Sequence, residues 1–201
     1  MVARIERLIT SGTFSLDGGT WDVDNNVWLV GDDDEVLVID AAHNAAAIVR
    51  AVGDRQVVAL VCTHGHNDHI NAAGEVRDAL KCPIWINSAD TMLWEAVYDD
   101  APDHDLVDGT TFEVAGSTVK AIHTPGHSPG STSLYAEDLE AVFTGDTLFH
   151  GGPGATGRSY SDKPTILESI RTRLLTLPTG TVVHTGHGDT TTIAAEVGNI
   201  S

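Results

Sequence analysis

Histidine and aspartate side chains are crowded into one short stretch of the chain. Residues 63–69 read THGHNDH and bring together His64, His66, Asp68 and His69. Imidazole and carboxylate groups are ligands that zinc and iron use in proteins. Two histidines separated by one residue can converge on one ion, whereas Asp68 and His69 can face a different point. The stretch therefore predicts a metal site.

Each of these residues, taken alone, also has an ordinary structural explanation. Asp68 could cap the N-terminus of a helix, but a cap does not explain the three histidines around it. The chain has 10 histidines, so some must lie at the surface or in the core. We interpret four of them in that way: His43, His104, His123 and His184. The sequence alone assigns no role to His150 or Asp189 and does not settle that of His43.

Three further segments repeat the pattern of a polar residue directly after an apolar run. HTPGHSPGS (123–131) contains His127, FTGDTLF (143–149) contains Asp146, and HTGHGD (184–189) contains His187. Loops that follow a strand commonly carry functional residues, because the rigid strand positions them. Independent surface histidines do not explain a potential ligand after each of four separated strands.

The elements that must position these residues alternate along the chain. Val- and Ile-rich runs predict strands over residues 26–30, 35–40, 57–63, 83–86, 117–124, 131–136, 141–145 and 181–186. The acidic run at 31–35 predicts a solvated hairpin turn. Helices are predicted over 44–52, 70–80, 89–98 and 163–177, with Asn44 as N-cap of the first and Pro164 in the first turn of the last. Two successions of strands and helices indicate helices packed outside a pair of sheets.

Composition limits the class of protein. The 201 residues, 41% hydrophobic and 20% charged, predict one globular domain over residues 1–201. No apolar run approaches the roughly 20 residues of a membrane helix, and the start MVARIERLIT lacks the apolar core of a signal peptide. We therefore expect a cytoplasmic protein without a membrane partner, and we interpret Cys62 and Cys82 as reduced thiols, with Cys62 buried.

The net charge of −18 repels phosphate backbones, so we expect no nucleic-acid partner. The partner expected instead is a small-molecule substrate. The oligomeric state does not follow from the sequence.

The four segments, in this order and spacing, resemble the metallo-β-lactamase superfamily over about residues 40–187. The resemblance implies an α+β fold, the αββα sandwich, in which two mixed sheets face each other with helices outside. It also implies a two-metal site at one edge. His64, His66 and His127 would hold the first ion, Asp68, His69 and His187 the second, and Asp146 would bridge them. Asp40 matches the family's early aspartate, implied to orient the site, although a strand-end cap explains it equally well.

Within the superfamily, HTPGHSPGS and GDTLF are typical of the glyoxalase II group of hydroxyacyl-thiol hydrolases. In that group a glycine-rich loop precedes a basic residue and a nearby tyrosine that hold the thiol's peptide. Arg158 and Tyr160 occupy those places here, although Arg158 could instead pair with a surface carboxylate. The chain ends at Ser201, before the group's extra helical region, and has Asp189 where relatives carry tyrosine. Both departures argue against glutathione itself as the carrier.

The resemblance implies a thioesterase that uses a metal-bound hydroxide, with Asp68 and Asp146 orienting the nucleophile. The cofactor would be two divalent ions, zinc first, with iron or manganese as alternatives. A related alternative is a persulfide dioxygenase with one iron on His64, His127 and Asp146. A second alternative is a non-catalytic metal-binding module. Hydrolysis of β-lactams ranks lower, because one subclass of those enzymes has cysteine where Asp146 stands.

Overall fold

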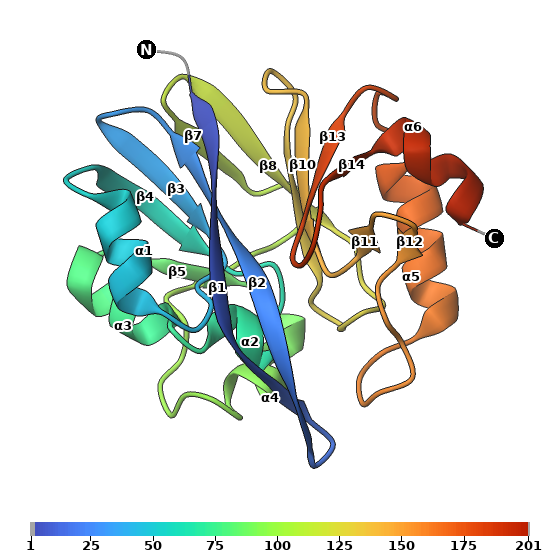
Figure 1. Cartoon of the computed structure of the whole chain (residues 1–201), viewed down its shortest axis with the longest axis horizontal. Helices are drawn as coiled ribbons and strands as arrows, with labels where there is room; N and C mark the ends of the chain where they lie inside the picture. The colour runs from blue at the N-terminus through green and yellow to red at the C-terminus, as the bar shows by residue number, and fades with distance from the viewer. Residues whose placement is uncertain (1–2, 201) are drawn as a thin grey trace.

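The computed structural model describes residues 3–200 and contains two six-stranded sheets that face each other (Figure 1). The first sheet has the order β1 (Arg4–Leu16), β2 (Gly19–Gly31), β3 (Glu35–Ile39), β4 (Gln56–Val61), β5 (Ile84–Ile86) and β6 (His104–Asp105). The second has the order β14 (Thr191–Thr192), β13 (Val182–Thr185), β10 (Ala141–Gly145), β9 (Thr132–Ala136), β8 (Ser117–His123) and β7 (Thr111–Val114). A short hairpin joins β11 (Leu148–Phe149) and β12 (Gly152–Pro153).

Both sheets are mixed. β3, β4, β5 and β6 run parallel, whereas the hairpin β1–β2 and its pairing with β3 are antiparallel. In the second sheet β10 and β13 run parallel and the other neighbours are antiparallel. Parallel neighbours place their carboxyl ends, and the loops that follow them, at the same edge of a sheet.

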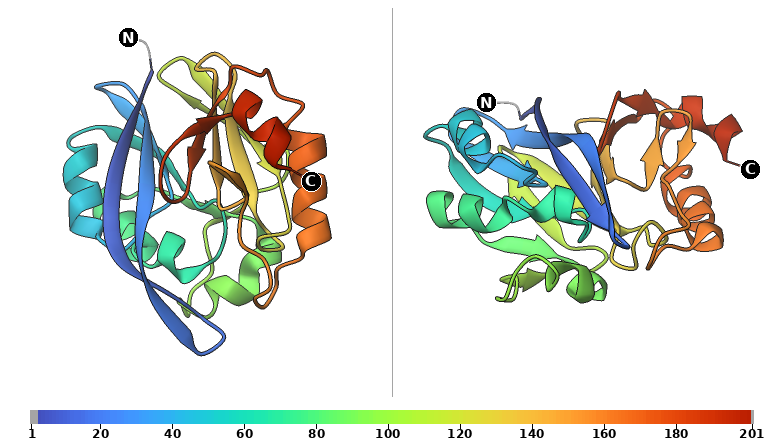
Figure 2. Two further views of the ribbon diagram at one scale, coloured as in Figure 1. Left: turned by 45° about the vertical axis from the view of Figure 1, so that its right-hand side comes forward. Right: turned by 60° about the horizontal axis from the view of Figure 1, so that its bottom comes forward.

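The helices cover the outer faces of the sheets. They are α1 (Ala45–Val52), α2 (Asn67–Ile70), α3 (Ala73–Leu80), α4 (Thr91–Trp94), α5 (Lys163–Ser169) and α6 (Ile193–Glu196), with a π-helix (Ile170–Leu174) and two 3-10 helices (Ser88–Asp90, Val197–Asn199). α1 and α3 lie outside the first sheet and α5 outside the second (Figures 1 and 2). The αββα sandwich is therefore confirmed. No helix among residues 3–200 is long and apolar enough to cross a membrane.

Side-chain alternation along the strands builds the layers. Val36 and Val38 of β3 pack toward α1 and α3, whereas Leu37 and Ile39 pack toward the second sheet. Phe143 of β10 belongs to this second cluster, between the sheets. A third cluster joins the opposite face of the second sheet to α5 and the π-helix. Each sheet thus buries both faces, which fixes the positions of the loops at its edge.

Three of the four helix predictions had wrong extents. The helix predicted over 89–98 is a 3-10 turn followed by the short α4, because the carbonyl of Trp94 accepts from both Val97 and Tyr98 (2.9 Å each) and ends the ladder. The helix predicted over 163–177 becomes a π-helix at Ile170, which bonds to Leu175 (2.9 Å). The wider turn keeps residues four apart on the buried face.

The helix predicted over 70–80 is two helices, α2 and α3, separated near Ala72, whose backbone N–H donates to the carbonyl of Ala41 (3.0 Å). The predicted caps are confirmed. Asn44 accepts from the backbone N–H of Ala47 (2.9 Å), and Pro164 lies in the first turn of α5.

Candidate metal centre

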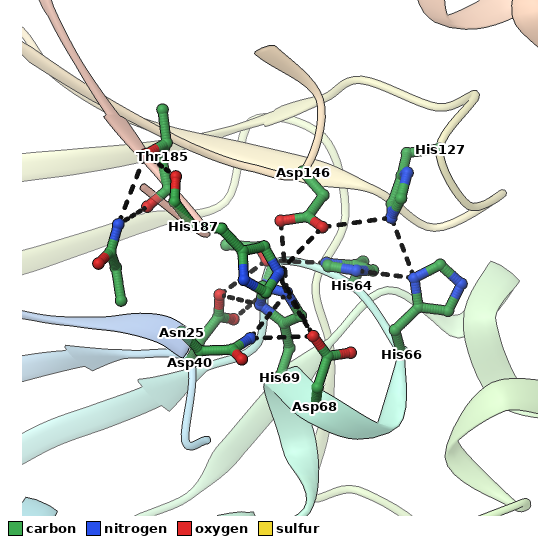
Figure 3. A network of polar contacts seen from close by, with 12 residues as sticks. Asn25, Asp40, His64, His66, Asp68, His69, His127, Asp146, Thr185 and His187 are labelled. Atoms are coloured by element: carbon green, nitrogen blue, oxygen red, sulfur yellow. Dashed lines mark hydrogen bonds and ion pairs between the residues drawn. The ribbon is translucent and has the colours of Figure 1, made fainter. Parts of the chain in front are cut away.

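The structure brings all seven predicted ligand side chains together at one edge of the sandwich (Figure 3). The first sheet supplies four of them after β4 and in α2: His64, His66, Asp68 and His69. The second sheet supplies three from the loops after β8, β10 and β13: His127, Asp146 and His187. Their ligand atoms form overlapping groups within 4.8 Å.

One ligand group consists of three imidazoles. Nδ1 of His66 lies 3.0 Å from Nε2 of His64 and 3.0 Å from Nε2 of His127. The outer nitrogens of the other two rings face acceptors. Nδ1 of His127 donates to the carbonyl of Ala155 (2.9 Å), and Nδ1 of His64 donates to Oγ1 of Thr63 (3.1 Å). Nε2 of His64 and Nε2 of His127 therefore present lone pairs toward Nδ1 of His66, and Nε2 of His66 has no partner among the described residues.

Burial favours the neutral form of two of these imidazoles, His64 and His66. It lowers the pKa of His64 well below the usual histidine value, and the neighbouring imidazoles lower it further. Burial and the nearby His127 lower the pKa of His66 to about 3. Neutral, buried imidazoles with converging lone pairs are the state in which histidine binds a metal.

The second ligand group adds carboxylates. Nε2 of His187 lies 3.3 Å from Oδ2 of Asp68 and 3.3 Å from Oδ2 of Asp146. Nε2 of His69 lies 3.3 Å from Oδ1 of Asp146. Burial alone lowers the pKa of His187, but the Asp146 carboxylate outweighs it and raises the pKa to about 10. This end of the cluster therefore attracts positive charge.

The cluster also contains a buried oxygen without a partner. Oδ1 of Asp68 has no hydrogen-bond partner among the described residues, and Oδ1 of Asp146 has only the 3.3 Å contact with Nε2 of His69. A buried carboxylate oxygen without a partner is costly unless a cation or a water binds it. Two adjacent sets of nitrogen and oxygen donors, with Asp146 between them, fit a pair of divalent metal ions.

Asp40, at the end of β3, holds two parts of the cluster. Its Oδ1 accepts from the backbone N–H of Thr63 (2.7 Å), and its Oδ2 accepts from Nδ1 of His69 (2.8 Å). Asp40 adopts a left-handed backbone conformation with φ 61°, which is rare for an aspartate and common at functional sites. The structure thus places Asp40 where it orients His69 and the start of the THGHNDH loop.

Asp90, at the end of a 3-10 turn, is a site residue that the sequence did not reveal. Its side chain is fully buried and accepts from the backbone N–H of Gly65 (2.8 Å), the backbone N–H of Gly130 (2.6 Å) and Oγ of Ser128 (2.6 Å). One carboxylate therefore joins the loops that carry His66 and His127. Nothing in the stretch NSAD distinguishes this aspartate from an ordinary cap.

A pocket of about 210 Å³ opens beside the cluster. Its outer wall comes from the β1–β2 hairpin, where Phe14 and Trp21 face each other with ring centroids 5.7 Å apart. The Arg158 guanidinium lies 3.7 Å from the centroid of the Trp21 ring. None of the ion pairs among residues 3–200 includes Arg158, so its predicted alternative, a surface ion pair, is not formed.

Other predicted residues lie away from the pocket. Tyr160 is 51% exposed and does not line the pocket. His150 and Asp189 are exposed, as is His104. Nε2 of His123 donates to the carbonyl of Pro129 (2.9 Å). Cys62 and Cys82 are buried free thiols, as expected.

The remaining two histidines are partly buried. His184 stacks on Phe143 with ring centroids 4.9 Å apart, which agrees with a core position. Burial lowers its pKa to about 4. His43 contacts Asn25, a buried residue of β2 that the sequence did not single out. A pair of polar residues directly before an apolar strand, as in DNNVWLV, was the available signal.

Comparison with known proteins identifies the family. The model of the metallo-beta-lactamase superfamily matches residues 20–187, so the chain belongs to that superfamily. It is 32% identical over 188 residues to the hydroxyacylglutathione hydrolase GloC of Haemophilus influenzae, with 85% of this chain and 89% of that protein covered. The match begins at residue 20, earlier than the sequence motifs indicated, and includes most of β2.

Solved structures agree. The di-iron-bound form of TTHA1623 has a TM-score of 0.79 and 28% identity, and the alignment covers 88% of this chain and 94% of that chain. The B3 metallo-beta-lactamase BLEG-1 has a TM-score of 0.79 and 27% identity, with 95% and 98% covered. The His and Asp cluster of this chain thus has the composition and setting of a divalent-metal site in a hydrolase of this family.

Proposed function

We propose that the protein is a binuclear metal-dependent thioesterase that cleaves a hydroxyacyl thioester. The observation that carries this proposal is the convergence of seven buried or half-buried ligand side chains into two adjacent sets beside a pocket. In this proposal His64, His66 and His127 would hold the first ion, Asp68, His69 and His187 would hold the second, and Asp146 would serve both. Similarity to a hydroxyacylglutathione hydrolase supports the substrate class. Similarity to a di-iron form supports two ions, of which zinc is our first choice and iron or manganese the alternatives.

Two adjacent divalent ions supply a nucleophile at neutral pH, because they lower the pKa of a bound water from about 15.7 toward about 7. The protein's own part is to hold and orient. The carboxylates of Asp68, whose Oδ1 has no partner, and of Asp146 can accept hydrogen bonds from the attacking water and direct its lone pair at the thioester carbonyl carbon. The leaving thiolate has an ordinary pKa of about 8.5, so it departs without a general acid. In agreement, Arg158 is the one titratable residue lining the pocket outside the ligand set.

The pocket suggests how the substrate lies. A volume of about 210 Å³ accommodates an acyl group, whereas the carrier thiol must extend outward. Phe14, Trp21 and Val23 offer an apolar wall. Arg158 supplies a fixed positive charge for a carboxylate, and we propose that the exposed Tyr160 contacts the outer part of the carrier. The substrate we propose is a small molecule, and the net charge of −18 argues against nucleic acid and anionic membrane.

The first test is the metal content of protein purified without chelators or affinity histidines, followed by thiol release from a panel of hydroxyacyl thioesters. We expect about two ions per chain and turnover that His127→Ala and Asp146→Asn nearly abolish. The exposed His104→Ala variant serves as a matched control and should keep full activity. Full activity of His127→Ala or Asp146→Asn would refute the assignment.

The same panel separates the alternatives. One iron per chain together with oxygen uptake on a persulfide would establish the dioxygenase. Two bound ions without turnover of any thioester or persulfide would establish a binding module. Hydrolysis of a chromogenic cephalosporin, with no thioester activity, would place the chain with the β-lactamases.

A further inference from the structure

Asn25 of β2 is buried against the second ligand group. Its side chain has no exposed surface, and its Nδ2 lies 3.0 Å from Oδ2 of Asp68 and 3.2 Å from Nε2 of His69 (Figure 3). The backbone of the same strand holds the third member of this group, because the carbonyl of Asp24 accepts from Nδ1 of His187 (2.8 Å). β2 therefore contacts the three side chains proposed to hold the second ion, Asp68, His69 and His187.

A chain of hydrogen bonds fixes which way the Asn25 amide points. It starts at the backbone N–H of His43, which donates to Oδ1 of Asn71 (2.6 Å). The Asn71 oxygen is thereby identified, so its Nδ2 donates to Nδ1 of His43 (3.0 Å). The His43 ring proton must then lie on Nε2, which donates to Oδ1 of Asn25 (2.8 Å). Nδ2 of Asn25 is left to face Asp68.

The backbone conformation, packing and burial of His43 hold its ring in contact with Asn25. Its backbone adopts the left-handed conformation with φ 61°, which costs free energy for any residue with a side chain. The ring packs on the backbone of Gly12 in β1, where a Cβ atom would lie 2.2 Å from Nδ1. Burial lowers the pKa of His43, so the ring stays neutral at pH 7 and keeps its accepting Nδ1.

We propose that Asn25 and His43 are positioning residues of the second ion site: His43 orients Asn25, and Asn25 fixes the carboxylate of Asp68. The inference rests on the two-ion site of the proposed function and is independent of its substrate. Second-sphere hydrogen bonds of this kind orient ligands and commonly change metal affinity by about 10- to 100-fold.

The effect should be confined to one site. The partners that orient the first group are different residues, namely Thr63 for His64, Ala155 for His127, and Asp90 for the two backbone segments. None of these contacts passes through Asn25 or His43. Loss of the hydrogen bonds from His43 to Asn25 and from Asn25 to Asp68 should therefore weaken binding of the second ion and leave binding of the first unchanged.

The test is stepwise binding of zinc to the metal-free protein in competition with a chromophoric chelator, with cobalt absorption as a second readout. The variants are Asn25→Ala, His43→Leu and His43→Gln, with His104→Ala as an exposed-histidine control. We expect Asn25→Ala and His43→Leu to weaken the second equivalent by about 10-fold or more, with the first equivalent unchanged. His43→Gln keeps a donor toward Asn25 and should restore much of the affinity. Circular dichroism of each variant verifies that it is folded.

Unchanged binding of the second equivalent in both Asn25→Ala and His43→Leu would overturn the inference. Equal weakening of both equivalents would also overturn it, since that is the result of a general loss of structure. A wild-type protein that binds a single equivalent would remove its basis. Two equivalents with the expected selective loss, but no thioester hydrolysis, would uphold the inference while the proposed substrate fails.

Discussion

Replacing Asp90 by asparagine tests whether one buried carboxylate holds two ligand loops in place. Oδ2 of Asp90 accepts from Gly65 and Ser128, and Oδ1 accepts from Gly130. An asparagine has one side-chain oxygen, so at best it keeps the two bonds made by Oδ2. Its amide nitrogen would then face the N–H of Gly130, and that donor would lose its partner.

The magnitude follows from this count. A lost hydrogen bond to a charged group costs about 1.5–3 kcal/mol when the site is buried. Burial also raises the pKa of Asp90, which shows that the carboxylate carries a desolvation cost that asparagine avoids. We therefore expect the free energy of unfolding of the metal-free protein to fall by about 1–2 kcal/mol, which for a chain of this size is a decrease in Tm of about 2–8 °C.

Besides lowering the stability of the protein, the substitution should weaken binding of the first ion. Gly65 lies between two ligand histidines, and Ser128 follows a third, so a displaced Asp90 moves all three rings of the first group. We expect the affinity for the first ion to fall by about 10-fold. Urea titration followed by tryptophan fluorescence measures stability, and chelator competition measures affinity. Asp105→Asn is the matched control, because exposed Asp105 also bonds a backbone N–H and hydroxyl, both of Ser88 (2.8 and 3.1 Å).

The reasoning is refuted if Asp90→Asn and Asp105→Asn behave alike. In that case the unfolding free energy of both would stay within about 0.5 kcal/mol of wild type, as for an ordinary surface substitution, and the first ion would bind with unchanged affinity. The three bonds to Asp90 would then be a consequence of the fold and would not hold the ligand loops.

Three other predictions concern the pocket. Arg158→Leu should raise KM for thioesters that carry a carboxylate and leave kcat and metal content unchanged, and steady-state kinetics that show an equal effect on a neutral thioester would contradict it. Ser159 donates two hydrogen bonds to Asp17, which lower the pKa of that carboxyl group. The contact is therefore kept above the ordinary carboxyl pKa and lost as pH falls through the lowered value. Amide protection in residues 157–161, measured against the exchange rate of an unstructured peptide at the same pH, should therefore fall there and, at pH 7, in Asp17→Asn; equal protection would exclude the contact. The net charge of −18 repels an anionic substrate, and salt screens this repulsion. We therefore expect kcat/KM for an anionic thioester to rise as salt shortens the Debye length from about 30 Å at 0.01 M to about 8 Å at 0.15 M, with no change for a neutral thioester. A fall for the anionic substrate would show that the positive charge of Arg158 dominates the long-range field.

The sandwich and the ligand set were predictable because their signals are local. Each apolar run has the length of a strand, and each potential ligand directly follows such a run, as Asp146 follows β10. Parallel pairing then carries these loops to one edge whatever the details of packing. Helix extents were less predictable, since the break between α2 and α3 coincides with a hydrogen bond from Ala72 to the carbonyl of Ala41, which is distant in the sequence.

The supports of the ligands were not predictable for a related reason. Asp90 lies 25 residues from Gly65 and 40 from Gly130 in the sequence, and no short pattern records such contacts. Asn25 reaches Asp68 across 43 residues. The strand β1 was missed because its apolar residues are spaced irregularly on a sheet edge where only Thr10 is buried, which gives a weak signal.

The β1–β2 hairpin contributes to the core, to the support of the metal ligands and to the pocket. The inner end of β2 contributes Trp28 to the core between the sheets, its middle contributes Asn25 to the second ligand group, and its outer end contributes Trp21 to the pocket wall. Phe14 of β1 pairs directly with Trp21, so the pocket wall is part of the same hairpin. One strand therefore supplies both a support of the metal ligands and a wall of the pocket, and the seven ligand residues alone do not define the site.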